Sequence, residues 1–147
     1  MDIRPARKED VPAIVGMLAD DPLGASRETP DDLAPYYAAF ERIENDPHQH
    51  LMFAVKDGKP AGTFQLSIQQ GLGRRGASRA VIEAVRVQKD MRGEGLGTEL
   101  MRWAIARSRE LGASLVQLTS DNTRADAHRF YERLGFARTH VGYKMPL

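Results

Sequence analysis

The stretch that decides the fold is residues 85–98, VRVQKDMRGEGLGT. It begins at the end of a nearly continuous apolar run, residues 80–87, which is typical of a strand buried on both faces of a sheet. The turn that follows carries three glycines in alternate positions, Gly93, Gly95 and Gly97. A strand, a Gly-rich turn and a helix in this order predict an anion site, because the first amides of a helix have no acceptor within it. Arg92 adds a fixed positive charge, so a pyrophosphate is the expected ligand.

Two familiar phosphate loops do not match this turn. The dinucleotide fingerprint requires G-x-G-x-x-G, whereas these glycines are spaced G-x-G-x-G. The nucleoside-triphosphate loop requires G-x-x-x-x-G-K-[ST], and no glycine of the chain is followed by Lys-Ser or Lys-Thr. The pattern that remains is Arg92-x-x-Gly95-x-Gly97.

Length and composition set outer limits on the function. The chain has 147 residues, which fits a single domain over residues 1–147. It has no cysteine, so disulfides, thiolate metal sites and a Cys nucleophile are excluded, and His48 and His50 have no nearby third ligand, so no metal is expected. The net charge is +1, which favours neither nucleic acid nor membrane as a partner. We see no leader peptide and no long apolar run, and we expect a cytoplasmic protein.

Hydrophobic periodicity predicts a mixed α/β domain. Strands are expected at residues 3–6, 51–55, 61–68, 80–87, 115–118 and 136–145. Helices are expected at residues 9–19, 30–45 and 97–111, with a fourth helix that is capped by Thr123 and runs through Leu134. Asp57-Gly58 is a hairpin turn, whereas the later strands alternate with helices and need crossovers. One mixed sheet with helices on both faces follows from this order.

A second motif strengthens the case made by the loop. Residues 125–136 read ADAHRFYERLGF and are preceded by Asn122. Together with Arg92-x-x-Gly95-x-Gly97, and in this order, they make the chain resemble the GNAT superfamily of N-acetyltransferases over roughly residues 2–145. The resemblance implies a central mixed sheet of six to seven strands. It also implies that the Gly-rich turn binds the pyrophosphate of acetyl-coenzyme A.

The resemblance further assigns roles to individual residues. Backbone amides would bind the pyrophosphate at Arg92, Gly93, Gly95, Leu96, Gly97 and Thr98. The backbone of Val85 and Val87 would run beside the pantetheine arm, and an amide there would polarise the thioester oxygen. Tyr131 is the expected general acid toward the coenzyme sulfur. Asn122 would either bond the pantetheine or cap the following helix.

Glu83 is the candidate general base. It is a carboxylate within an apolar strand, where burial without a purpose is expensive. Strand alternation places it on the face of Val81, Val85 and Val87. A buried carboxylate holds its proton more readily, which suits a base that works near neutral pH. The alternative is a salt bridge to Arg79 or Arg86.

These observations predict an enzyme that moves the acetyl group of acetyl-coenzyme A to a primary amine, by direct transfer in a ternary complex. Residues 9–46 carry about ten acidic residues, which form either a solvated surface or a wall that faces a cationic acceptor. We therefore expect a small-molecule amine as acceptor. A protein-lysine or N-terminal acetyltransferase and a catalytically silent coenzyme A sensor are the alternatives. The resemblance also implies a homodimer.

Overall fold

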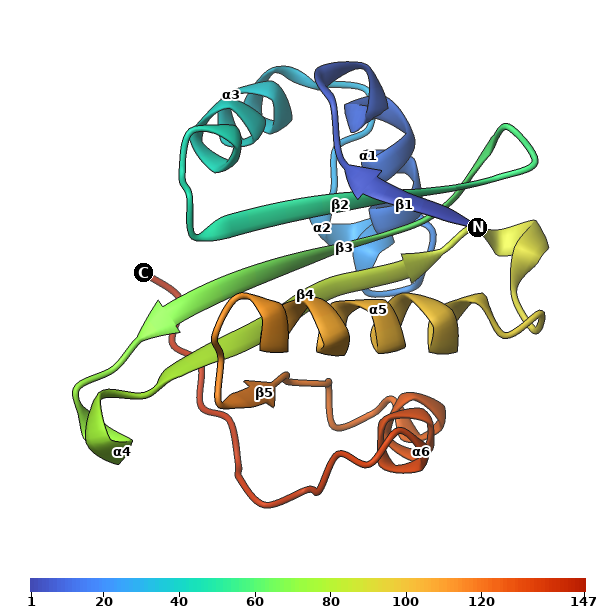
Figure 1. The fold of residues 1–147 in the computed structure, drawn as a ribbon. Helices are drawn as coiled ribbons and strands as arrows, with labels where there is room; N and C mark the ends of the chain where they lie inside the picture. The colour runs from blue at the N-terminus through green and yellow to red at the C-terminus, as the bar shows by residue number, and fades with distance from the viewer. The chain divides into compact units, whose positions relative to one another are not determined.

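A five-stranded sheet with the strand order β1-β2-β3-β4-β5 forms the centre of residues 1–117 (Figure 1). The strands are β1 (Asp2–Pro5), β2 (Gln49–Lys56), β3 (Lys59–Gln70), β4 (Ser78–Val87) and β5 (Leu115–Gln117). The first four pair antiparallel, and β5 pairs parallel with β4. The computed structural model describes residues 1–147, which form two compact units, Met1–Gln117 and Leu118–Leu147. The mixed α/β class is confirmed, with five strands where six to seven were expected.

Helices cover both faces of this sheet, as Figure 1 shows. The helical segments of the first unit are η1 (Lys8–Asp10), α1 (Val11–Ala19), α2 (Gly24–Arg27), α3 (Ala34–Glu44), α4 (Gly73–Gly76), η2 (Lys89–Met91) and α5 (Leu96–Glu110). Val11 and Phe40 bring α1 and α3 against Leu51 on one face, which we call the α1–α3 face. On the opposite face the ring of Trp103 from α5 lies 5.8 Å from the ring of Phe64, and we call this the α5 face.

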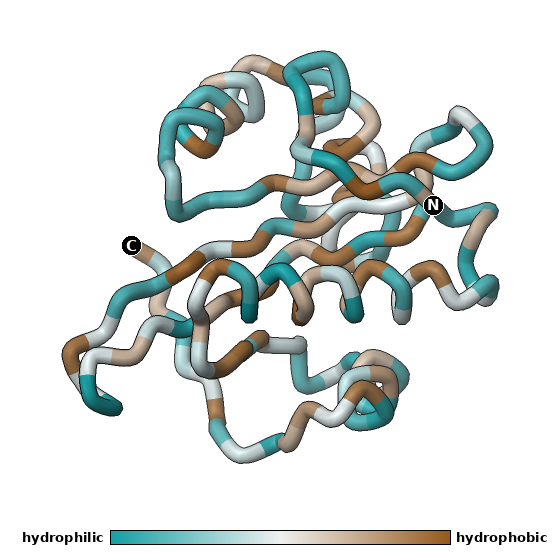
Figure 2. Tube along the Cα trace, viewed as in Figure 1, coloured by the Kyte–Doolittle hydropathy of each residue, from teal (hydrophilic) through white to brown (hydrophobic).

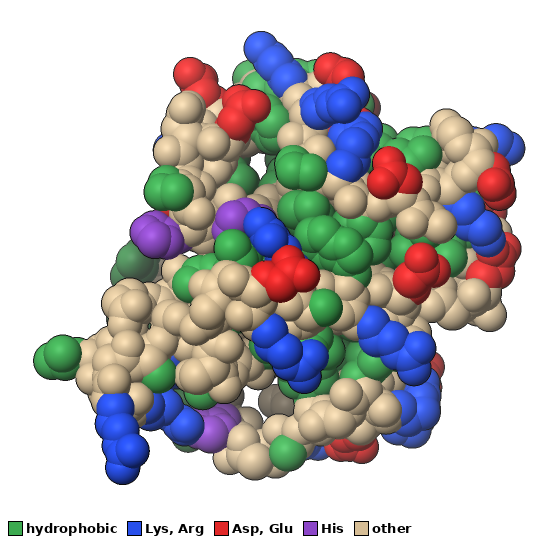
Figure 3. Space-filling model, viewed as in Figure 1, with side chains coloured by type: hydrophobic (Ala, Val, Ile, Leu, Met, Phe, Trp, Pro, Cys, Tyr) green, Lys and Arg blue, Asp and Glu red, His purple; other side chains and the backbone are tan.

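Because side chains alternate along each strand, the sheet packs against helices on both of its faces. Leu51 and Phe53 of β2 pack with α1 and α3, whereas Leu66 and Ile82 on the α5 face are buried. Figure 2 shows hydrophobic residues along the central strands and at intervals along α5, with hydrophilic residues between them. On the face drawn in Figure 3, acidic side chains lie among basic ones.

Arg4 and Asp10 form a partly buried ion pair. Both guanidinium nitrogens of Arg4 donate to the Asp10 carboxylate, at 2.7 and 3.0 Å, and the amide of Arg7 donates at 2.7 Å. Burial alone would raise the pKa of Asp10, but the hydrogen bonds from Arg4 and Arg7 outweigh it and leave that pKa below its ordinary value. This pair fastens β1 to the start of α1.

Most expected elements are confirmed, with shifted ends. Asp57 and Gly58 form the hairpin turn with φ of 51° and 74°, as the sequence predicted. The helix expected at residues 30–45 is α3, which begins at Ala34. The amide of Asp32 donates to the carbonyl of Thr29 at 3.0 Å and closes a turn before it. None of the helices combines the length and the apolar character that a membrane span requires.

The second unit, residues 118–147, departs most from expectation. It contains the helix α6 (Ala125–Arg133) and no strand, so the strand predicted at residues 136–145 is wrong. The side chains that an amphipathic strand would bury are exposed there, namely Val141, Tyr143 and Met145. The capping box at Thr123 is also wrong, since the cap residue is Arg124 and Asp126 pairs with Arg129 instead. In the turn before α6, the carboxylate of Asp121 accepts a hydrogen bond from the Thr123 amide at 2.9 Å.

Candidate active site

A β-bulge interrupts β4 at Ala84 and Val85. In the register between β3 and β4, Gln65 pairs with Glu83 and Thr63 pairs with Arg86, so two residues of β4 stand opposite Phe64 alone. Ala84 has a φ of 53°, in the left-handed region that alanine seldom adopts. The extra residue shifts every later side chain of β4 to the other face.

This bulge decides which side chains lie together. Thr63 and Gln65 lie on the α1–α3 face because they pair with Phe53 and Leu51 of β2. Their partners on β4, Glu83 and Arg86, therefore lie on the α1–α3 face as well.

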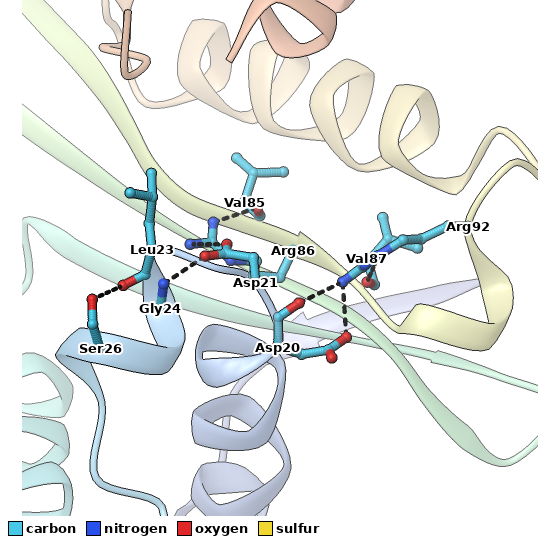
Figure 4. Close-up of polar contacts among 9 residues, drawn as sticks. All are labelled: Asp20, Asp21, Leu23, Gly24, Ser26, Val85, Arg86, Val87 and Arg92. Atoms are coloured by element: carbon cyan, nitrogen blue, oxygen red, sulfur yellow. Dashed lines mark hydrogen bonds and ion pairs between the residues drawn. The ribbon is translucent and has the colours of Figure 1, made fainter. Parts of the chain in front are cut away.

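The expected grouping of Glu83 with Val85 and Val87 is therefore wrong, whereas Val81, which pairs with Ser67, shares the face of Glu83 as expected. Val87 pairs with Gly62 and belongs to the α5 face. Figure 4 shows the side chain of Val85 pointing away from Asp21, the partner of Arg86. Simple alternation, on which the grouping rested, fails because of the added residue.

Glu83 is exposed, which contradicts the expectation of a buried carboxylate. It also forms no salt bridge: Arg79 donates to the Gln117 amide oxygen at 3.0 Å, and Arg86 pairs with Asp21. The exposure has a simple origin, because β5 accompanies β4 only from Arg79 to Val81. The carboxylate is therefore available to a ligand.

The backbone of β4 beyond Val81 has no strand partner on its β5 side. The carbonyl of Val85 accepts a hydrogen bond from Nη1 of Arg86 at 2.9 Å, and the carbonyl of Val87 accepts one from Nε of Arg92 at 3.2 Å. A carbonyl can accept a second hydrogen bond. An extended ligand can therefore lie along this edge in the manner of an added strand.

The Gly-rich turn leads from β4 into α5. Gly93 and Gly95 have φ of 85° and 83°, and a Cβ at either position would point into open space. None of the amides from Gly93 to Thr98 donates to an acceptor of the chain. Leu96 buries its side chain in the core while its amide stays free. Free amides at the positive end of a 15-residue helix fit a diphosphate in both charge and geometry.

Charged side chains around the turn are already paired. Lys56, from the β2–β3 hairpin, donates to Glu94 at 2.5 Å, and this hydrogen bond raises the pKa of Lys56. The guanidinium of Arg92 was expected to face a phosphate. It donates instead to Asp20, to the carbonyl oxygen at 3.3 Å and to Oδ2 at 3.0 Å (Figure 4). The turn therefore offers amides rather than an unpaired arginine.

Tyr131 and Asn122 belong to the second unit. Tyr131 lies half-buried on α6, with its ring 5.2 Å from that of Phe130 and 6.0 Å from that of Phe136. Asn122 is exposed and does not cap α6, so the capping alternative is wrong. The role of each toward the coenzyme stays a prediction. The structure holds no group of three or more His, Asp or Glu side chains that could bind a metal.

Sequence reasoning missed Asp20 and Asp21, the acids that end α1 and pair with Arg92 and Arg86. A weak signal was present. An acid at the carboxyl end of a helix opposes the helix dipole, which suggests that it serves a partner elsewhere.

A mixed sheet with a bulged strand that leads through free amides into a helix offers a site for an anionic group such as a diphosphate. The Acetyltransferase (GNAT) family model matches residues 13–136, and this chain belongs to that family. It is thus an acetyltransferase by class.

Two named relatives are acetyltransferases. The chain is 28% identical over 146 residues to the aminoalkylphosphonate N-acetyltransferase of Salmonella typhimurium, covering 99% of this chain and 91% of the relative. It is 29% identical over 138 residues to the L-methionine sulfoximine/L-methionine sulfone acetyltransferase of Pseudomonas aeruginosa, covering 91% of this chain and 78% of the relative. A crystal structure described as a transcriptional regulator from Bacillus halodurans C-125 is 42% identical, with a TM-score of 0.94 and 99% of each chain covered.

Proposed function

We propose that this protein transfers the acetyl group of acetyl-coenzyme A to the primary amine of a small molecule, by direct transfer in a ternary complex. The observation that carries the proposal is the run of free amides from Gly93 to Thr98, placed between the bulged strand β4 and the start of α5. The family supplies the reaction class, and these amides supply a place for the diphosphate. The proposal treats residues 1–147 as one catalytic domain. The homodimer implied by the family resemblance remains part of it.

The acceptor is proposed to carry an acid group beside its amine. The relatives from Salmonella and Pseudomonas are named for an aminoalkylphosphonate and for methionine derivatives, which are small amines with an acid group. On this chain the α1–α3 face of β4 presents the unpaired carboxylate of Glu83. Arg79 lies four residues before Glu83 on β4, and its side chain donates a hydrogen bond to the neutral amide of Gln117. An ammonium group at Glu83 and an acid near Arg79 would match these charges.

Three groups of the chain carry the proposed chemistry: Glu83, a backbone amide of β4, and Tyr131. Glu83, directly or through a water, takes one proton from the ammonium group of the acceptor. The freed amine nitrogen attacks the thioester carbon, the carbon–sulfur bond breaks, and a backbone amide of β4 holds the negative charge on the carbonyl oxygen. Tyr131 gives its proton to the departing sulfur, and the second proton that the nitrogen loses on becoming an amide returns, directly or through a water, to the tyrosinate. An N-acetylated amine and free coenzyme A are released, and holding both substrates together supplies much of the acceleration.

A panel of amines assayed by the release of free thiol tests this proposal. The panel should contain aminoalkylphosphonates, amino acids, amines without an acid group, and lysine peptides, each with acetyl-coenzyme A. We expect saturable turnover with small amines that carry an acid group, and lower kcat/KM for amines that lack it. Preference for peptides would replace the small-molecule acceptor, and coenzyme binding without turnover on any amine would favour a sensor.

A further inference from the structure

Two consecutive aspartates at the end of α1 pair with two arginines that come from β4 and from the turn after it (Figure 4). Oδ2 of Asp20 lies 3.0 Å from Nη2 of Arg92, and Oδ2 of Asp21 lies 3.1 Å from Nη2 of Arg86. The segment between α1 and α2, residues 20–24, is thereby fastened to the strand and the turn. We call it the α1–α2 junction.

The Arg92 guanidinium has three acceptors, none of which belongs to the turn itself. Its Nη2 donates to the carbonyl oxygen and to Oδ2 of Asp20, and its Nε donates to the carbonyl oxygen of Val87. These hydrogen bonds join the end of α1 to the end of β4. The amides from Gly93 to Thr98 remain free, so the anion-binding groups of the turn are distinct from the Arg92 side chain.

The pair of Asp21 and Arg86 is more buried than the pair of Asp20 and Arg92. The side chains of Asp21 and Arg86 are 20% and 17% exposed, and Oδ1 of Asp21 accepts the amide of Gly24 at 2.5 Å. A Cβ at Gly24 would lie 1.9 Å from the carbonyl oxygen of Leu18, so only glycine fits this close turn. The junction is therefore a tight structure anchored at Arg86.

The junction lies on the side of the sheet where the amine would react. Arg86 pairs with Thr63 across the sheet, and Glu83 pairs with Gln65, which places both charged residues on the α1–α3 face. The bulge at Ala84 is what brings them to one face although they are three residues apart. The junction that Arg86 anchors thus borders the face that presents Glu83.

We propose that Arg92 and Arg86 are positioning residues for the acceptor, which fix the α1–α2 junction beside Glu83 on the strand and turn that hold the coenzyme. This inference rests on the proposed function. The Arg92 side chain then orders the acceptor site through its pair with Asp20 and does not bind the diphosphate. Because the side chains of Asp20 and Arg92 are 35% and 45% exposed, their pair should add little to global stability. Its loss should be visible in local order and in acceptor binding.

Three variants and one control separate the two possible roles of Arg92. The variants are Asp20→Asn, Arg92→Gln and the double variant, and the control is Asp31→Asn, which removes an equal charge from an exposed position. For each, the dissociation constant of coenzyme A is measured by calorimetry and the acceptor KM by thiol release. Hydrogen exchange of the amides of residues 20, 21, 23 and 24 reports the order of the junction independently of activity.

The two roles predict opposite results for Asp20→Asn. If Arg92 positions the junction, each single variant raises the acceptor KM about fivefold or more and the double variant is no worse than either, while coenzyme affinity stays within about twofold. Hydrogen exchange of the junction amides at residues 20, 21, 23 and 24 then also becomes faster. If Arg92 binds phosphate, Arg92→Gln weakens coenzyme binding while Asp20→Asn tightens it, and the inference is overturned. Absence of coenzyme binding by the wild-type protein would defeat the proposed function itself.

Discussion

Replacing Gly95 by alanine tests the turn most sharply, because the chain supplies a matched control at the other end of the same helix. Gly95 precedes α5 with a φ of 83°, and Gly112 follows it with a φ of 84°. A Cβ at either position meets no atom within 4 Å, so neither substitution creates a clash. Alanine in the left-handed region costs about 1 kcal/mol. Both variants should therefore lower the melting temperature by about 3 °C in a chain of this size.

The two variants should differ only in coenzyme affinity. A methyl group at position 95 points into the open space beside the free amides, where we place the diphosphate. Loss of one charge-assisted hydrogen bond costs about 1.5–3 kcal/mol, so Gly95→Ala should raise the coenzyme A dissociation constant about tenfold or more. Gly112→Ala should leave it unchanged. Calorimetry with coenzyme A and differential scanning calorimetry measure the two effects, and equal affinities of both variants would refute the placement of the diphosphate.

Three further outcomes follow from individual side chains. Glu83→Gln should lower kcat about a hundredfold with little change in coenzyme affinity, as loss of a general base does; unchanged kcat would remove Glu83 from the chemistry. Tyr131→Phe should slow turnover while coenzyme binding persists, and full activity of this variant would exclude Tyr131 as the acid. The pKa of Asp10 is lowered in the folded chain, so its stabilising effect is present above about pH 4 and is lost as the pH falls through that lowered pKa. Asp10→Asn should lower the free energy of unfolding by about 2 kcal/mol at neutral pH. It should also flatten the pH dependence of that free energy, measured by urea unfolding between about pH 5 and pH 2, and an unaltered slope would contradict this.

The loop and the elements around it could be predicted from sequence because their signals are local. Alternating apolar residues, the Asp57-Gly58 turn and the glycines from 93 to 97 each specify a backbone conformation over a few residues. The structure confirms the elements in the predicted order up to α6. Element ends moved where a turn competed with a helix, as it does at Thr29 and Asp32.

The bulge at Ala84 left no such signal. Alanine has no preference for a φ of 53°, and the run from Ile82 to Val87 contains neither glycine nor proline to mark a break in the strand. The expected burial of Glu83 followed from that regular strand, and it failed where β5 leaves β4 after Val81. Both features depend on the register with neighbouring strands, which a single segment does not encode.

Long-range pairing was the other limit. Asp20 and Arg92 are 72 residues apart, so no local pattern indicates that they meet. The strand expected at residues 136–145 failed for a related reason: alternation is present, but a strand also requires a partner for its backbone groups.

The central claim is that the amides from Gly93 to Thr98 hold the diphosphate of an acyl carrier. Parallel calorimetric titrations with coenzyme A and with pantetheine, which lacks the diphosphate, test it directly. The account predicts saturable binding of one coenzyme A per chain and binding of pantetheine that is weaker by about a hundredfold or more, the loss of several charge-assisted hydrogen bonds. Equal affinities for the two compounds, or no heat from coenzyme A at millimolar concentration, would contradict it.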